Sequence, residues 1–187
     1  FIADGVGLCR NQLMFNRFVL VGPGADPAGV ATASSVMDAF RRIAENESRF
    51  ESRADQSGTH TKELEIWDLA RLDTSTFGPW YERTSQGMGA TLTIANERDA
   101  YTLSDDGTWF TREDALPFLR LLYLTDEPVL KNVYSVIPVS PAAHPHVLVE
   151  KAVLFASWLI GPDAQRLIAE YTINDHPIFT PAPARGC

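Results

Sequence analysis

The sequence predicts an α/β layered domain. Segments rich in β-branched and aromatic residues alternate with segments whose apolar residues recur at helical spacing. The 187 residues suffice for one large domain or a domain and a fraction. With 45% hydrophobic and 21% charged residues, the composition is that of an ordinary globular protein that can bury a core.

The expected strands are short apolar runs that end at turn residues. The segment 15–21 (FNRFVLV) is β-branched and aromatic, and Gly22-Pro23-Gly24 ends it. The segment 133–139 (VYSVIPV) is nearly continuous in β-branched residues, as buried strands are. Shorter candidates are 50–53, 100–103 and 119–124.

The expected helices begin at capping residues or glycines. Ser34-Ser35 precedes the first helix, Ser57-Gly58-Thr59 opens the second, and Gln86-Gly87-Met88-Gly89 opens the third. Asp105-Asp106-Gly107 is expected to form a turn. Two helices close the chain, a buried one within 147–160 and another that starts at Pro162-Asp163.

Charge and hydropathy exclude two classes of function. The 16 Lys and Arg residues against 24 Asp and Glu give a net charge of −8, and no basic stripe is present, so we expect no nucleic-acid partner. No stretch approaches the ~20 apolar residues of a membrane-spanning helix. Because the chain begins at Phe1, without an initiator methionine or a signal peptide, we expect a processed or trimmed terminus.

The two cysteines, Cys9 and Cys187, lie near opposite ends of the chain. They could form a disulfide that joins the termini in an oxidising compartment, or remain two unrelated thiols. Both interpretations stay open, because the sequence contains no distance. Their spacing excludes a clustered metal site or a CxxC redox site.

The first segment whose residues could form a functional site is 52–60 (SRADQSGTH), where a strand leads into a helix. The first N–H groups of a helix have no internal partner and carry partial positive charge. Gly58 allows close approach of a ligand, Ser57 and Thr59 add hydroxyl donors, and Arg53 adds a permanent charge. This combination predicts an anion site at a helix start. The competing interpretation is that Ser57 only caps its helix.

The second segment is 86–91 (QGMGAT), another glycine-rich helix start. Gly87 and Gly89 would let the backbone around Met88 approach a ligand, or would serve a loop that needs left-handed glycines. The segment is not a nucleotide phosphate loop, because no Gly-Lys-Ser/Thr follows.

Neither catalysis nor a metal is predicted. Ser57, His60 and Asp55 together suggest a serine hydrolase, but no G-x-S-x-G motif is present and the segment fits a helix cap better. His144-Pro145-His146 offers only two metal ligands in a loop, which is poor evidence for a site.

With these segments in view, the chain resembles the substrate-binding component of tungstate ABC transporters. The resemblance runs in order from about residue 1 to 181, and its most specific strings are SRADQSGTH and QGMGATL. The strings that carry it are 18–23, 26–29, 52–60 with 62–63, 80–81, 86–92, 100–103, 106–108 and 132–137.

The resemblance implies a type II periplasmic-binding-protein fold, with two α/β lobes joined by two crossing strands. The chain would supply the second lobe plus C-terminal helices of the first lobe. Residues 1–17 would be a remnant of the first lobe and hinge, 18–139 the second lobe, and 140–187 the C-terminal helices returning to the first lobe. The segments 15–21 and 133–139 would be the crossing strands.

The implied function is to bind a tetrahedral oxyanion, tungstate first, outside the cytoplasm and to deliver it to an ABC transporter permease. No cofactor is implied. The anion ligands would be the charge of Arg53, the hydroxyls of Ser57 and Thr59, and backbone N–H groups at Gly58, Met88 and Gly89. Molybdate, sulfate or phosphate on the same fold remain alternatives, with Asp55 as acceptor of a phosphate proton, and so does a secreted interaction module without transport.

The chain departs from the family at three places. Ala54 stands where the family usually has glycine, and Gln56 where it usually has an acid. The family's N-terminal segment, which carries a Thr/Ser-rich anion-binding string and most of the first lobe, is missing, so it would be a separate chain, a removed segment or the rest of a longer protein. Because an oxyanion must exchange its hydration for donors from both lobes, we expect this chain alone to bind tungstate weakly or not at all.

Overall fold

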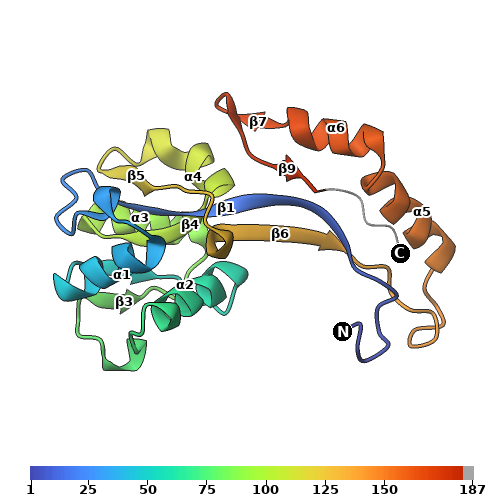
Figure 1. The fold of residues 1–187 in the computed structure, drawn as a ribbon, viewed down its shortest axis with the longest axis horizontal. Helices are drawn as coiled ribbons and strands as arrows, with labels where there is room; N and C mark the ends of the chain where they lie inside the picture. The colour runs from blue at the N-terminus through green and yellow to red at the C-terminus, as the bar shows by residue number, and fades with distance from the viewer. Residues whose placement is uncertain (183–187) are drawn as a thin grey trace. The chain divides into compact units, whose positions relative to one another are not determined.

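The computed structural model describes residues 1–182 and divides the chain into two compact units (Figure 1). One unit is Arg17–Lys131, and the other combines Phe1–Asn16 with the chain from Asn132 onward. The α/β fold class predicted from the sequence is confirmed. In chain order the elements are β1 (Asn11–Pro23), η1 (Val30–Thr32), α1 (Val36–Glu45), β2 (Phe50–Ser52), α2 (Gly58–Leu69), η2 (Thr74–Thr76), β3 (Tyr81–Arg83), α3 (Met88–Arg98), β4 (Thr102–Asp105), α4 (Asp106–Arg112), η3 (Glu113–Ala115), β5 (Leu119–Tyr123), η4 (Pro128–Leu130), β6 (Lys131–Val136), α5 (Val149–Leu159), α6 (Pro162–Glu170), β7 (Thr172–Ile173), β8 (His176–Pro177) and β9 (Thr180–Pro181), where η marks a 3-10 helix.

The Arg17–Lys131 unit is built on an antiparallel sheet with β1 between β4 and β5. Leu20 of β1 is opposite Leu103 on one side and Tyr123 on the other. The apolar run 18–21 explains this central position, because its side chains are at most 4% exposed and need cover on both faces. Gly22 extends the run where an ideal Cβ would lie 2.3 Å from the Tyr101 ring, so a side chain is excluded.

A second, parallel pair of strands carries the two helices that concern function. Strand β2 pairs with β3 in parallel, and Phe50 is opposite Tyr81. Helix α2 follows β2 along the chain, and α3 follows β3. The Tyr101 backbone continues the pairing on the other side of β2, because the Glu51 N–H donates to its carbonyl at 2.8 Å.

The core of this unit is aromatic. The Phe40 and Trp67 rings lie edge to face with centroids 4.4 Å apart, and Phe50 contacts both. Such pairs stabilise a core beyond the area they bury. The largest fully buried side chains of the described residues are Trp67, Tyr101, Phe40, Phe50, Leu20, Ile43, Ile66, Leu92, Leu103, Leu116, Leu119 and Leu130.

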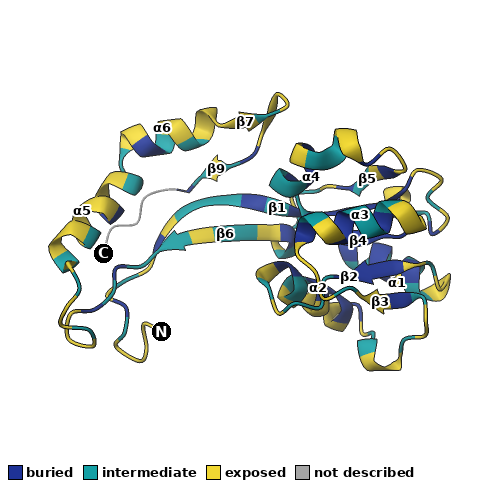
Figure 2. Cartoon of the chain, turned by 180° about the vertical axis from the view of Figure 1, so that it is seen from behind, coloured by how far each residue is buried: buried dark blue, intermediate teal, exposed yellow. Residues whose placement is uncertain are grey.

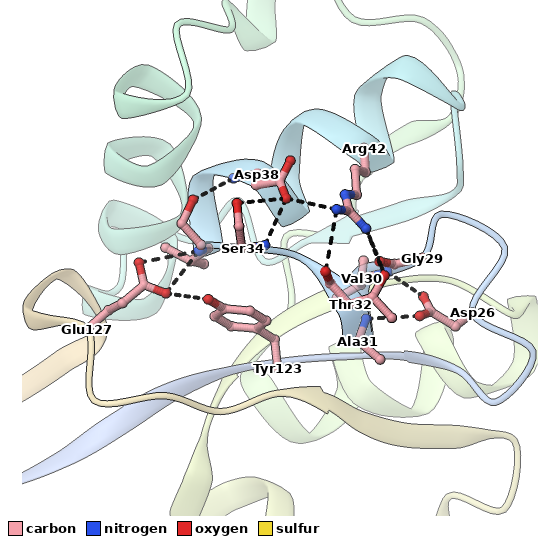
Figure 3. A network of polar contacts seen from close by, with 12 residues as sticks. Asp26, Gly29, Val30, Ala31, Thr32, Ser34, Asp38, Arg42, Tyr123 and Glu127 are labelled. Carbon is pink, nitrogen blue, oxygen red and sulfur yellow. Dashed lines mark hydrogen bonds and ion pairs between the residues drawn. The ribbon is translucent and has the colours of Figure 1, made fainter.

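Carboxylates fix the loop after β1 and the start of α1 (Figure 3). Asp26 accepts the N–H groups of Val30 and Ala31, both at 2.9 Å. Glu127 accepts the Val36 N–H at 3.0 Å and thereby supplies a negative charge to the positive end of α1. Ser35 caps the same helix through the Asp38 N–H. The start of α1 is therefore already occupied by groups of the protein itself.

The other unit exposes apolar surface on its two helices. Ala156 is the buried residue of α5, and Ala164 is that of α6. Figure 2 shows exposed positions along both helices, and on α5 these include Leu154 at 72% and Phe155 at 58% exposure. Strand β9 pairs with the first half of β1, with Met14 opposite Pro181.

Most of the elements predicted from the sequence are present, but three predictions were wrong. A helix, α4, stands at 106–112 where a turn was expected, because Asp105 caps it by accepting the Thr108 N–H. The helix expected to be buried within 147–160 is α5, which is largely exposed. The segment 133–139 lies partly in β6, none of whose residues is fully buried. Apolar composition reports only a preference for burial, and among residues 1–182 these two segments remain largely or partly exposed although α6 contacts α5 and β1 pairs with β6.

Glu63 is an acid inside the core. Its carboxylate accepts the Tyr81 hydroxyl at 2.6 Å and the Trp67 indole N–H at 3.3 Å. The residue is 2% exposed. Burial raises the pKa of Glu63 to about 7, and the hydrogen bond from Tyr81 only partly opposes that effect.

The backbone between β2 and α2 turns through two left-handed residues. Ala54 has φ 47° and Gln56 has φ 60°. A Cβ is unfavourable in this region, and glycine has no such penalty. The glycine that the resemblance implies at position 54 is therefore the residue that this backbone conformation favours.

We predict that Ala54→Gly stabilises the protein by about 0.5–1 kcal/mol, because relief of the left-handed strain exceeds the added freedom of the unfolded chain. Thermal unfolding followed by circular dichroism measures the change. Ala95→Gly, the same change inside α3, is the control and should destabilise by about 1 kcal/mol or more. A loss of stability in both variants would show that Ala54 is not strained.

We also predict that Glu63→Gln changes how stability depends on pH. The raised pKa means that folded Glu63 binds its proton more tightly than unfolded Glu63, so its contribution is fully present below about pH 4.5 and is lost as pH rises through about 7. The variant cannot ionise, so its stability relative to wild type should rise by about 3 kcal/mol between these limits.

Urea unfolding at a series of pH values tests this expectation. The matched control is Glu65→Gln, an exposed residue of the same helix that pairs with Lys62. Parallel pH profiles for wild type and Glu63→Gln would mean that folding does not raise the pKa of Glu63.

Candidate functional site

Two helices begin at one edge of the parallel strand pair, which we call the helix-start edge and define as residues 53–60 and 84–91. The Thr84 N–H and hydroxyl both donate to the Ser52 carbonyl, at 2.9 and 3.0 Å. The Thr84 hydroxyl also lies 3.1 Å from the hydroxyl of Thr91 in α3. These bonds join the segment before α2 to the segment before α3, so the structure brings the two sequence-predicted segments together.

At the first helix start, Ser57 caps α2. Its hydroxyl accepts the His60 N–H at 3.3 Å. The N–H groups of Gly58 and Thr59 donate to no group among residues 1–182. Gly58 is exposed, and an ideal Cβ there would meet no atom within 4 Å. Capping and ligand approach are therefore compatible here, since only one donor of the first turn is used by the cap.

Arg53 lies beside this turn with its side chain 15% exposed. It donates to the Thr59 hydroxyl at 3.2 Å and forms an ion pair with Asp55 at 2.5 Å. Its Nε is buried and has no partner among the described residues. A buried donor without an acceptor is costly, so this N–H is a donor that a ligand oxygen would satisfy.

Asp55 is the charge partner of Arg53 and orders the turn. Its second oxygen accepts the Ser57 N–H at 3.1 Å. Burial opposes ionisation of Asp55, yet the hydrogen bonds from Ser57 and Arg53 outweigh it and lower the pKa of Asp55. The carboxylate is therefore ionised at neutral pH, and both of its oxygens already accept a hydrogen bond.

The second helix start is open. Gly87 precedes α3, no side chain caps the helix, and its first turn contains no acid. The N–H groups of Met88, Gly89 and Ala90 donate to no group among residues 1–182. Met88 is buried, at 6% exposure, whereas Ala90 in the same turn is exposed.

Sequence reasoning missed Arg112, which lies against this second helix start. An ideal Cβ at Gly89 would be only 3.1 Å from Arg112 Nη1, so the guanidinium occupies the space that a side chain would need. Arg112 is the last residue of α4, a helix that begins where a turn was predicted from the sequence. No local pattern links residues 89 and 112, and only the packing of α4 on α3 brings them together.

The geometry of Ser57 and His60 does not form a catalytic pair. The His60 ring accepts the Gln56 N–H through Nδ1 at 3.1 Å, and Ser57 Oγ receives the His60 backbone N–H. Catalysis would require the His60 ring to accept the Ser57 hydroxyl proton, and no such bond is present among the described residues.

Two other sequence-derived expectations concern metal and thiols. Among residues 1–182, no group of three or more His, Cys, Asp and Glu side chains is arranged to hold a metal ion, and the His144 and His146 rings lie 6.1 Å apart. The pairing of Cys9 with Cys187 stays a prediction, because Cys187 lies outside the described residues.

Known proteins with similar sequences are binding proteins. A Haloferax volcanii protein, whose name assigns it to anion binding in ABC transport, is 43% identical over 97% of this chain and 53% of its own length. The tungstate-binding protein TupA of Peptoclostridium acidaminophilum is 36% identical over 99% of this chain and 65% of its own length. The chain thus spans less than two thirds of either relative.

Solved structures and a family pattern agree with these relatives. The tungstate-binding protein TupA from Desulfovibrio alaskensis G20 superimposes with a TM-score of 0.88 and is 38% identical, covering 98% of this chain and 74% of that chain. The sequence pattern described as a PBP superfamily domain matches residues 2–163. The chain therefore belongs to the PBP superfamily of binding proteins, in the same family as the Desulfovibrio alaskensis TupA.

Proposed function

We propose that this chain is part of an extracytoplasmic solute-binding protein that holds tungstate at the helix-start edge and delivers it to an ABC transporter permease. The observation that carries the proposal is that two helix starts with unused N–H groups are joined side by side, and that the first of them contains Arg53, whose buried Nε has no partner among the described residues. The tungstate-binding names of similar proteins support the choice of ion.

A small dianion needs this kind of site. It must exchange strongly bound water for donors, and backbone N–H groups at a helix start supply donors without a full charge. Residues 58–59 and 88–90 would supply these groups, and Ser57 and Thr59 would add hydroxyls. The Arg53 guanidinium would add charge and direction. Such a shell binds an anion but contains few charges that would prevent its release.

Asp55 favours a fully deprotonated oxyanion over phosphate. Recognition of protonated phosphate requires an acceptor for the phosphate proton, and Asp55 is the carboxylate beside the turn. Its two oxygens already accept hydrogen bonds from Arg53 and from the Ser57 N–H. A phosphate proton would have to compete with these bonds for Asp55, whereas tungstate, molybdate and sulfate carry no proton that needs an acceptor.

We propose in addition that 18–139 is the second lobe, with 1–17 as remnant and hinge, and that α5 and α6 return to the first lobe. The exposed apolar side chains of α5, which include Leu154 and Phe155, support this assignment, because a surface of this kind is typical of an interface. The greater length of the relatives is consistent with it. No helix among residues 1–182 combines the length and hydropathy needed to cross a bilayer.

Replacement of Arg53 tests the proposed function. In the protein that carries these 187 residues, we expect Arg53→Gln to weaken tungstate binding by about 10- to 100-fold, because a charge-assisted hydrogen bond is lost. Isothermal titration calorimetry measures the affinity, and molybdate, sulfate and phosphate are titrated in parallel. Arg71→Gln, at the opposite end of α2, is a control with the same charge change and should bind like wild type.

Three results would contradict the proposal. Absence of tungstate binding by the wild-type protein would remove the function. Equal affinities of wild type and Arg53→Gln would place the anion elsewhere. A dissociation constant below about 1 μM for the 187-residue chain alone would contradict the view that it supplies only part of the donor shell.

A further inference from the structure

We propose that Arg112 supplies the uncompensated positive charge of the oxyanion site and sets its preference for dianions over monoanions. This inference rests on the proposed function, and it adds a residue that neither the sequence motifs nor the capping pattern identifies. It follows from the charge balance of the helix-start edge and from the place of the Arg112 guanidinium.

Arg53 does not make the site positive. Its ion pair with Asp55 joins two side chains that are 15% and 21% exposed, and Asp55 stays ionised because its pKa is lowered. The first helix start therefore has one positive and one negative side chain in contact. A dianion that arrives there meets a donor in Arg53 but no net side-chain charge.

Arg112 lies along the first turn of α3. Its Nη1 would be 3.1 Å from an ideal Cβ of Gly89, and its Nη2 donates to the Thr93 hydroxyl at 3.2 Å. The Thr93 hydroxyl in turn donates to the Gly89 carbonyl at 3.1 Å. These contacts hold the guanidinium against the side of α3 at Gly89 and Thr93, in the same helix as the unused N–H groups of Met88 and Gly89.

The interaction of Arg112 with the start of α3 is electrostatically unfavourable in the absence of an anion. The first turn of a helix carries partial positive charge, and a cation beside it is repelled. Among the described residues, no carboxylate forms an ion pair with Arg112, and its Nε is buried without a partner. An anion at the start of α3 reverses the sign of this interaction, because it attracts both the helix end and Arg112.

The size of the effect should depend on ligand charge. A half-buried cation a few ångströms from a bound dianion is expected to contribute about tenfold to affinity after solvent screening. For a monoanion of the same shape the logarithm of the effect is halved, which gives about threefold. Tungstate and perrhenate are tetrahedral oxyanions of similar size with charges of −2 and −1, so they form a matched pair of probes.

A structural role for Arg112 makes a different prediction. Arg112 is the basic residue in the last turn of α4, where a cation stabilises the negative end of a helix. If that were its only role, Arg112→Gln would lower the melting temperature of the anion-free protein and would change tungstate and perrhenate binding by the same factor.

The test uses calorimetric titration of tungstate and perrhenate into wild type, Arg112→Gln, Arg112→Lys and Arg71→Gln, together with anion-free melting curves. We expect Arg112→Gln to lose about tenfold in tungstate affinity and about threefold in perrhenate affinity, with an unchanged or raised melting temperature. Arg112→Lys should retain most of the tungstate affinity, because the charge is kept. Arg71→Gln should bind both ions like wild type, because α2 places it roughly 18 Å from the helix start.

The failures of this inference and of the proposed function are distinguishable. If Arg53→Gln abolishes binding while Arg112→Gln leaves both affinities unchanged, the site stands and the role of Arg112 is overturned. Equal losses for the two ions, or a lost affinity that Arg112→Lys does not restore, would also overturn it. If the wild-type protein binds neither ion, both proposals fall together.

Discussion

The hydrogen bonds from Thr84 to the Ser52 carbonyl are the constraint on which the helix-start edge depends. They close the gap between two parallel strands at the point where each strand ends and a helix is about to begin. Parallel strands place their carboxyl ends at one edge, and the helix starts that follow present unused N–H groups there. The positive ends of two helices would repel each other if nothing held them, so this junction fixes an arrangement that an anion can use.

The residues that support this edge include a buried acid and two residues in unfavourable backbone conformations. Glu63 lies buried under the turn that contains Arg53, and its hydrogen bonds from Tyr81 and Trp67 join α2 to the aromatic core. Ala54 and Gln56 hold left-handed conformations that a side chain disfavours. Strain of this kind persists where the surrounding structure determines the backbone, and here it lies directly beside Arg53, which contacts Asp55 and Thr59. These unfavourable features lower the stability of the fold at the place where ligand contacts are proposed.

The sequence predicted what depends on neighbouring residues and missed what depends on distant ones. The cap at Ser57 and the glycines at 87 and 89 are local signals, and the helices they announce are present. The partnership of Gly89 with Arg112 joins residues far apart in sequence and exists only because α4 packs on α3. Apolar composition predicted burial for α5, but composition does not reveal which surface, if any, covers a helix. The roles of Arg53, Ser57, Thr59 and Met88 in binding remain predictions, because proximity to an edge is not contact with a ligand.

The state of Arg53 before any ligand arrives has a kinetic consequence. Thr59 and Asp55 already hold its guanidinium, so this long side chain has lost its rotational freedom in advance of binding. An incoming oxyanion does not have to wait for the arginine to find its place, and arrival at the site should be equally fast for ions of the same charge. Discrimination among tungstate, molybdate and sulfate would then lie in residence time: the ion that fits the fixed donors best is the one that leaves most slowly.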